Sequence, residues 1–141
     1  MLALDAKPNA AHLKLAKLEA KGKLKAVVTQ NIDNLHERAG SSHIIHLHGE
    51  LTKVCSSRDP HNPHYIKELK PEEYEVKMGD KAGDGTQLRP FIVWFGEAVP
   101  EIETAIQYVE KADIFVIIGT SLNVYPAAGC FIMYREEQRC I

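Results

Sequence analysis

Short apolar segments alternate along this chain with segments of helical periodicity. Strands are predicted over Lys25 to Thr29, Ile44 to Leu47 and Ile114 to Ile118. The last of these is the most hydrophobic, and we place it at the centre of a sheet. Strands separated by helical segments are typical of α/β proteins with a parallel sheet. The pattern therefore predicts a parallel, doubly wound α/β core.

Helices are expected between these strands. The first follows Asp5 or Asn9, either of which is a suitable N-cap, and ends at Gly22. The remaining predicted elements are a short helix at Ile32 to Ala39, a strand at Phe91 to Phe95, and helices at Pro100 to Lys111 and Pro126 to Glu137.

The periodic pattern breaks between Thr52 and Leu88, where prolines, glycines and charged residues are frequent. A segment of this length without regular structure is more often an inserted module than a connection. We therefore expect a core made of residues 1–51 and 89–141, and a small irregular module made of residues 52–88.

Composition narrows the class of protein further. The chain has 141 residues, 45% of them hydrophobic and 26% charged, which is typical of one soluble globular domain. Its net charge of −2 offers no basic excess for nucleic acid. No apolar run approaches the roughly 20 residues that span a membrane. Three cysteines without a pattern fit a reducing cytoplasm, where we place the protein.

Polar side chains follow directly after three of the predicted strands. Gln30, Asn31 and Asp33 follow the first, His48 follows the second, and Gly119 to Ser121 follow the third. Because the carboxyl ends of parallel strands meet at one edge of a sheet, these groups should converge on one ligand-binding crevice. The sequence therefore indicates an enzyme rather than a scaffold, and it requires His48 to lie near the Gly119 turn.

Two of these groups have alternative interpretations. Gly119 to Ser121 offer backbone N–H groups and hydroxyls to a phosphate, although the same tripeptide also forms ordinary turns. His48 suits a general base, since an imidazole titrates near neutral pH. The alternative for His48 is a histidine that is hydrogen-bonded for structural reasons.

Two further groups are less distinctive. One of Gln30, Asn31 and Asp33 is expected to cap the helix that follows. Three polar residues exceed what capping needs, so the others are expected to recognise a ligand rich in hydroxyls and amides. Trp94 and Phe95, which precede a glycine, indicate an apolar wall beside a close approach of backbone.

Taken together, four motifs resemble those of the sirtuin family of NAD-dependent protein-lysine deacylases, and above all the short bacterial sirtuins. Their order and spacing match over roughly residues 8 to 130. The motifs are Thr29 to His36, His48-Gly49-Glu50, Leu88-Arg89-Pro90 with Val93 to Glu97, and Gly119 to Ala128.

The resemblance implies a Rossmann-like core with a small inserted module, and NAD as cosubstrate. In the sirtuin reaction the acyl group moves from lysine to ADP-ribose as nicotinamide leaves. His48 is then the implied base that activates a ribose hydroxyl. The implied cofactor-binding residues are Gln30, Asn31, Ile32, Asp33, Gly119, Thr120 and Ser121.

The resemblance also implies a binding site for an acylated lysine in a protein or peptide substrate. A substrate strand is expected to add between two loops of the enzyme. The implied substrate-binding residues are Val93, Phe95, Gly96, Glu97 and Val124.

The chain departs from the family at both ends of the cofactor site. The glycine-rich segment that opens a sirtuin has no counterpart before Pro8, and the adenosine-binding part has none after Cys130. We therefore expect an internal fragment, and the alternative function is an inactive fragment that at most binds NAD or ADP-ribose. Exposed strand faces and edges in such a fragment predict self-association.

The inserted module departs from the family as well. Most sirtuins bind a structural zinc there through two Cys-x-x-Cys pairs. Cys55 has no such partner, and His61 and His64 would supply at most three ligands with it. We therefore expect no zinc, and a module that holds its shape by packing alone or is mobile. A metal-binding module built on the seven histidines is a third interpretation.

Overall fold

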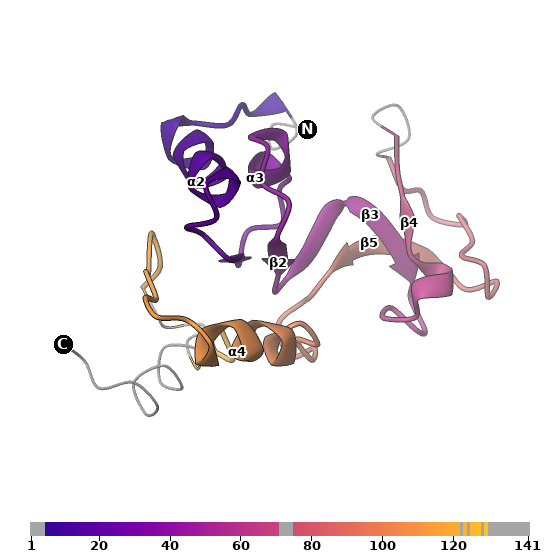
Figure 1. Ribbon diagram of the computed structural model, residues 1–141. Coiled ribbons are helices and arrows are strands. Elements are labelled where there is room, and N and C mark those ends of the chain that lie inside the picture. Colours follow the sequence, from indigo (N-terminus) through magenta and orange to yellow (C-terminus); the bar gives the residue numbers. More distant parts are fainter. Residues whose placement is uncertain (1–4, 71–74, 122, 124, 128, 130–141) are drawn as a thin grey trace.

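The computed structural model describes residues 5–70, 75–121, 123, 125–127 and 129 (Figure 1). No helix in these ranges is long and apolar enough to cross a membrane. The elements are α2 (Ala10–Ala20), β1 (Val27–Thr29), α3 (Leu35–Arg38), β2 (Ile44–His46), β3 (Gly49–Ser56), η1 (Pro63–Tyr65), β4 (Lys67–Glu68), β5 (Leu88–Ile92) and α4 (Ile102–Glu110).

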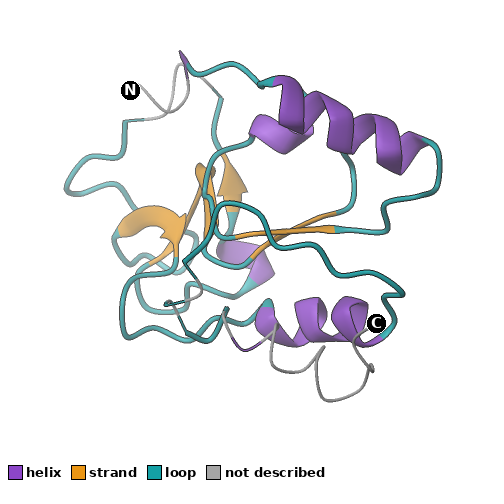
Figure 2. Ribbon diagram, turned by 90° about the vertical axis from the view of Figure 1, so that its left-hand side faces the viewer, coloured by secondary structure: helices purple, strands orange, loops and turns teal. Residues whose placement is uncertain are grey.

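The strands β1 and β2 form a parallel pair in which Thr29 lies opposite His46. In Figures 1 and 2, α2 and α3 lie on one side of this pair and α4 lies on the other. Helices on both sides of parallel strands confirm the predicted α/β class. The buried core between β2 and α4 consists of Ile45, Leu47, Ala105, Val109 and Ala127.

The first helix begins where its sequence predicts. The Oδ1 atom of Asn9 accepts hydrogen bonds from the backbone of Ala11 at 2.9 Å and of His12 at 3.2 Å. The ring of His12 in turn accepts from the backbone N–H of Asn9 at 3.2 Å, which completes a capping box. Asn9, rather than Asp5, is therefore the N-cap of α2.

A second, antiparallel sheet has the strand order β4-β3-β5 and extends away from the helices (Figure 1). Val54 and Cys55 of β3 are almost fully buried in it. Residues 52–88, expected to be irregular, thus contain most of β3 together with η1 and β4. Because β3 and β5 cross the expected boundaries, the division of the chain into core and module stays a prediction.

A buried hydrogen-bond network joins the end of β3 to the loop before β5. Ser56 is fully buried, and its Oγ donates to Asp84 at 2.7 Å and contacts Thr86 Oγ1 at 2.9 Å. The same oxygen accepts from the backbone N–H groups of Arg58 and Asp59, both at 3.0 Å. The bonds from Ser56 and Thr86 lower the pKa of Asp84 to about 2. Polar contacts as well as packing therefore connect β3 to this loop.

The segment 114–118 corrects the sequence prediction, because it forms no strand. Ile114, Val116 and Ile118 are exposed, whereas Phe115 packs against the core. An apolar, β-branched sequence becomes a strand only beside another strand, and none of the strands among the described residues pairs with this segment.

Other predicted elements are shifted or shortened. The strand expected at 91–95 is β5, which begins at Leu88 and ends at Ile92 because the next residues form a turn. The helix expected at 32–39 is limited to four residues. The helix expected at 126–137 lies almost entirely outside the described residues.

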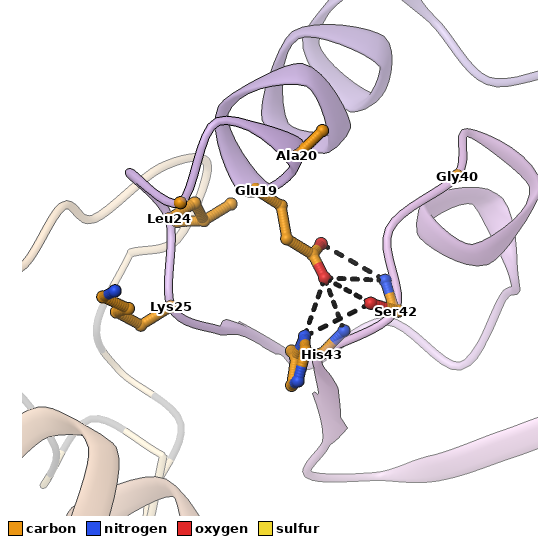
Figure 3. A pocket seen from close by; sticks show the side chains of 8 residues that line it. Glu19, Ala20, Leu24, Lys25, Gly40, Ser42 and His43 are labelled. Carbon is orange, nitrogen blue, oxygen red and sulfur yellow. Dashed lines mark hydrogen bonds and ion pairs between the residues drawn. The ribbon is translucent and has the colours of Figure 1, made fainter.

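Glu19, near the end of α2, anchors this helix to the segment before β2 (Figure 3). Its carboxylate accepts the backbone N–H groups of Ser42 and His43, both at 3.0 Å. It also accepts the Ser42 hydroxyl at 2.6 Å and contacts His43 Nδ1 at 2.9 Å. These hydrogen bonds, from Ser42 first and then His43, lower the pKa of Glu19 to about 2.

Replacing this carboxylate tests the anchor. In Glu19→Gln, the free energy of unfolding at pH 7 is expected to fall by about 1 kcal/mol, because the acceptor of these hydrogen bonds is no longer charged. Solvent screening keeps this loss small. A lowered carboxyl pKa stabilises the fold above the ordinary value near 4.5, and this contribution is lost as pH falls toward 2. Urea unfolding at pH 7, 4 and 3 should therefore show the deficit shrinking with pH. Glu103→Gln on α4 is the matched control, and an equal Glu19→Gln deficit at all three values would contradict the anchor.

Candidate functional site

The candidate site lies at the edge of the β1–β2 pair where both strands end. Parallel pairing brings residues 30–33 and residues 47–48 to this same edge. Contact between the two segments continues beyond the strands, because Leu47 N–H donates to the Thr29 carbonyl at 3.0 Å. Leu51 N–H likewise donates to the Ile32 carbonyl at 2.8 Å. The two polar segments are thus held side by side by the backbone.

His48 is half-buried, and one hydrogen bond fixes the orientation of its ring. Its Nδ1 lies 3.1 Å from the carbonyl oxygen of Gln30. A carbonyl only accepts hydrogen bonds, so Nδ1 carries the proton and Nε2 of the neutral ring keeps its lone pair. The sequence prediction of a structural, hydrogen-bonded histidine and that of a base are therefore compatible, because Nδ1 forms this bond and Nε2 forms none within the part of the chain that the structure describes.

Gln30 also reaches the predicted phosphate-binding turn. Its Nε2 donates to Thr120 Oγ1 at 3.3 Å, while its carbonyl holds His48. Gly119 has a φ of +68°, which favours glycine, and Gly119, Thr120 and Ser121 are all exposed. Gln30 thus contacts both His48 and the Gly119 turn. The shared ligand-binding crevice stays a prediction.

The other predicted cofactor residues occupy the same loop with different contacts. Asp33 accepts the backbone N–H of Leu35, the first residue of α3, at 3.0 Å. The N-cap of this helix is Asn34, whose side chain forms no capping hydrogen bond, so the expected cap by Gln30, Asn31 or Asp33 is wrong. Asn31 is exposed, and its backbone N–H donates to the Thr29 hydroxyl at 3.1 Å. The backbone carbonyl of Ile32 accepts the hydrogen bond from Leu51 of β3. Their roles toward NAD stay predictions.

Gly49 connects His48 to the antiparallel sheet. Its φ is +81°, and a Cβ atom at this position would collide with the carbonyl oxygen of Phe91. Next to it, the backbone N–H of Val93 donates to the His48 carbonyl at 2.9 Å. The candidate base and the predicted substrate-binding segment are therefore joined through the backbone.

The predicted substrate-binding segment forms a turn that displays aromatic side chains. Phe95 is fully exposed and Trp94 is 54% exposed, which is unusual for large apolar groups. Gly96 has a φ of +90°, which allows the chain to reverse here. Val124, the remaining predicted member of this group, lies outside the described residues.

The carboxylate of Glu97 holds this turn closed. It forms a two-pronged ion pair with Arg89, at 2.7 Å to Nη1 and 3.1 Å to Nη2. It also accepts the backbone N–H of Trp94 at 3.0 Å. The contact with Arg89 lowers the pKa of Glu97. Glu97 was predicted to bind substrate; in the structure its carboxylate shapes the loop that carries Phe95.

One group of described residues has the composition of a metal-binding set: Glu37, His46 and Glu50, whose ligand atoms lie within 4.8 Å of one another. These atoms already have partners, because His46 Nε2 lies 2.6 Å from Glu37 and Lys53 Nζ lies 2.6 Å from Glu50. The group is therefore best described as an ion-pair network. Sequence reasoning missed it, and the one available signal was a second histidine two positions before His48.

The residues considered for zinc are separate from this network. Cys55 is a buried free thiol, and burial raises its pKa. In the part of the chain that the structure describes, Cys55, His61 and His64 do not converge as a ligand group. The ring of His61 instead packs edge-on against Phe91, with ring centroids 6.4 Å apart. The expected lack of zinc stays a prediction.

Comparison with known proteins places this site in a family. The sequence model described as the Sir2 family matches residues 1–126. An NAD-dependent protein deacylase of Bacteroides thetaiotaomicron is 84% identical over 126 residues, which are 89% of this chain and 53% of that protein. Another, of Helicobacter pylori, is 52% identical over 130 residues, which are 92% of this chain and 54% of that protein. The chain thus spans about half the length of the curated relatives it matches.

Solved structures agree with the sequence comparison. A Sir2 homologue in complex with ADP-ribose has a TM-score of 0.84 and 38% identity, over 96% of this chain and 53% of that one. A Sir2 complex with a p53 peptide and NAD+ has a TM-score of 0.79 and 38% identity, over 97% and 57%. These likenesses confirm the predicted Rossmann-like fold. With the family model matching from residue 1 to residue 126, the chain belongs to the Sir2 family.

Proposed function

We propose that this chain carries the catalytic base and parts of the NAD and substrate sites of an NAD-dependent protein-lysine deacylase of the sirtuin type. Such an enzyme transfers an acyl group from lysine to ADP-ribose and releases nicotinamide. The observation that carries the proposal is the position of Gln30, whose carbonyl binds His48 Nδ1 and whose side chain binds Thr120 of the Gly119 turn. Relatives named NAD-dependent protein deacylases support it.

The residues around Gln30 suit a dinucleotide. Exposed hydroxyls of Thr120 and Ser121 beside a glycine with positive φ would hold phosphate oxygens. The Gln30 amide and the exposed Asn31 side chain would meet the ribose and nicotinamide. NAD supplies the ADP-ribosyl group when it is bound. The loop in turn orients the cosubstrate and excludes water from it.

The hydrogen bond from His48 to Gln30 makes the ring an effective base. When Nε2 takes up a proton from a ribose hydroxyl, the positive charge spreads to Nδ1–H. The Gln30 carbonyl, 3.1 Å away, stabilises that charge without moving. Gln30 would thus link proton uptake, through its backbone carbonyl, to phosphate binding, through its side-chain amide.

The turn from Val93 to Glu97 would form one wall of the acyl-lysine site. Its exposed aromatic rings offer an apolar surface for an acyl chain, and its backbone offers an edge to an extended peptide. Solved Sir2 structures contain acetylated peptide. The bond between Val93 N–H and the His48 carbonyl would keep this wall in register with the base.

We also propose that the chain self-associates through the exposed side chains of Ile114, Val116 and Ile118. Light scattering is expected to show oligomers, and Val116→Lys should shift them toward monomer because it places a charge among these apolar side chains. A monodisperse monomer before substitution would contradict the association.

We place the protein in the reducing cytoplasm, and a free thiol at Cys55 is compatible with that compartment.

Removal of the proposed base is the direct test of the function. In His48→Ala, deacylation of an acetyl-lysine peptide with NAD is expected to fall by about 10²- to 10⁴-fold, because the proposed acceptor of the ribose proton is removed. Mass spectrometry of the peptide measures the loss, and His64→Ala, which changes an exposed histidine of η1, is the control.

Calorimetric titration with NAD completes this test. The original chain and His48→Ala should both bind NAD with a Kd below 1 mM, since the substitution leaves the phosphate-binding turn unchanged. Undiminished activity in His48→Ala would contradict the assigned base. NAD binding by a protein without any deacylation would favour the alternative of an inactive binder of NAD or ADP-ribose.

A second test addresses the substrate wall. Glu97→Gln weakens the pair with Arg89, so the turn should loosen and the KM for the acylated peptide should rise about threefold to tenfold while the KM for NAD changes little. Trp94 is the only tryptophan in the chain and reports the turn directly. Acrylamide quenching of its fluorescence is expected to increase in Glu97→Gln and not in the control Glu101→Gln. Unchanged quenching together with an unchanged KM would contradict the role of the ion pair.

A further inference from the structure

The ring of His46 lies between two hydrogen-bond acceptors. Its Nδ1 is 3.1 Å from the carbonyl oxygen of Asn31, and its Nε2 is 2.6 Å from a carboxylate oxygen of Glu37. A carbonyl and a carboxylate both accept, and a neutral imidazole has a single N–H to donate. Both bonds therefore form together only when the ring is a doubly protonated imidazolium.

The surroundings of the ring favour that charge. The side chain is only 7% exposed, and this burial by itself lowers the pKa of His46. The bonds to Glu37 and to the Asn31 carbonyl outweigh burial, and the nearby Glu50 on β3 adds to them, so the pKa is raised above its ordinary 6.5. The pKa of the neighbouring His36 on α3 is lowered, first by burial and then by nearby charges that include His46.

The two histidines of this strand end hold consecutive carbonyl groups. His48 binds the carbonyl of Gln30, and His46 binds that of Asn31. The difference lies at Nε2, which contacts Glu37 in His46 and has no bond in His48 among the described residues. One ring is thus available for proton transfer, whereas the other can only hold the loop in place.

We propose that His46 is a positioning residue, which in its imidazolium form latches the loop from Asn31 to Asp33 through Glu37 and so sets the affinity for NAD. This inference rests on the proposed function for its effect on NAD. When the ring loses a proton, one of its two bonds must break. The loop is then released from α3 or from β2, although the base His48 keeps its own bond to Gln30.

The sign of the pH dependence follows from the charge. A histidine whose pKa is raised in the folded state stabilises that state fully below its unfolded value near 6.5. This contribution is lost as pH rises through the higher folded value. NAD should therefore bind more weakly on the alkaline side, in the direction opposite to that expected from a base that must be neutral to act.

The test combines NMR of the imidazole nitrogens with NAD titrations between pH 5.5 and 9. At pH 6.5 both nitrogens of His46 should be protonated, and the backbone amide signals of residues 31–33 should shift with the same midpoint as the ring. Glu37→Gln removes the charge and keeps an acceptor, so the midpoint should fall and the Kd for NAD at pH 7.5 should rise about threefold to tenfold. Glu103→Gln is the matched control on α4.

Two further measurements keep the outcomes distinct. Repeating the NMR titration in His48→Ala removes the neighbouring imidazole, and the amides of residues 31–33 should still follow His46. A thermal midpoint measured for each variant shows that the fold is retained. A singly protonated His46 at pH 6.5, or loop amides that do not follow it, would overturn the latch. Failure of the original chain to bind NAD at any pH would instead count against the proposed function, and the amide signals would still decide the latch.

Discussion

The parallel pairing of Thr29 with His46 is the constraint on which the rest of this site depends. It ends two strands at one edge, so that a loop of polar residues and a pair of histidines leave the sheet together. A slip of one residue would turn alternate side chains to the opposite face. His46 and His48 would then lose the carbonyl groups of Asn31 and Gln30, and with them the orientation of both rings.

Two imidazoles in nearly equivalent positions acquire different chemistry from one carboxylate. Glu37 stands at Nε2 of His46 and favours its charged form, and no such carboxylate contacts His48 in the described structure. When a hydrogen-bond acceptor occupies the second ring nitrogen, the imidazole keeps a proton there and serves as a hydrogen-bond donor instead of transferring protons. Local placement of charge, rather than residue type, therefore separates the base from the latch.

The sequence was sufficient where local rules decide the structure. A cap at Asn9, one of two candidates, and strands close to the observed β1 and β2 follow from short-range patterns. The choice of His48 as the base stays a prediction. The sequence was insufficient where distant partners decide. The antiparallel pairing of β3 with β5, the ion pair of Arg89 with Glu97 and the unpaired segment 114–118 depend on which residues the fold brings together. Neither periodicity nor composition contains that information.

Carboxylates hold the antiparallel sheet and the loop beside it. At one end of β3, Asp84 accepts a hydrogen bond from the Ser56 hydroxyl. Beyond the end of β5, Glu97 accepts hydrogen bonds from the Arg89 guanidinium and from the Trp94 backbone N–H. Both carboxyl groups have lowered pKa values, through hydrogen bonds from Ser56 and Arg89 respectively. Their contribution is therefore complete at neutral pH and is lost as acid protonates them. The sheet and the loop that carries Phe95 therefore depend on ionised carboxylates, just as the anchor of α2 depends on Glu19.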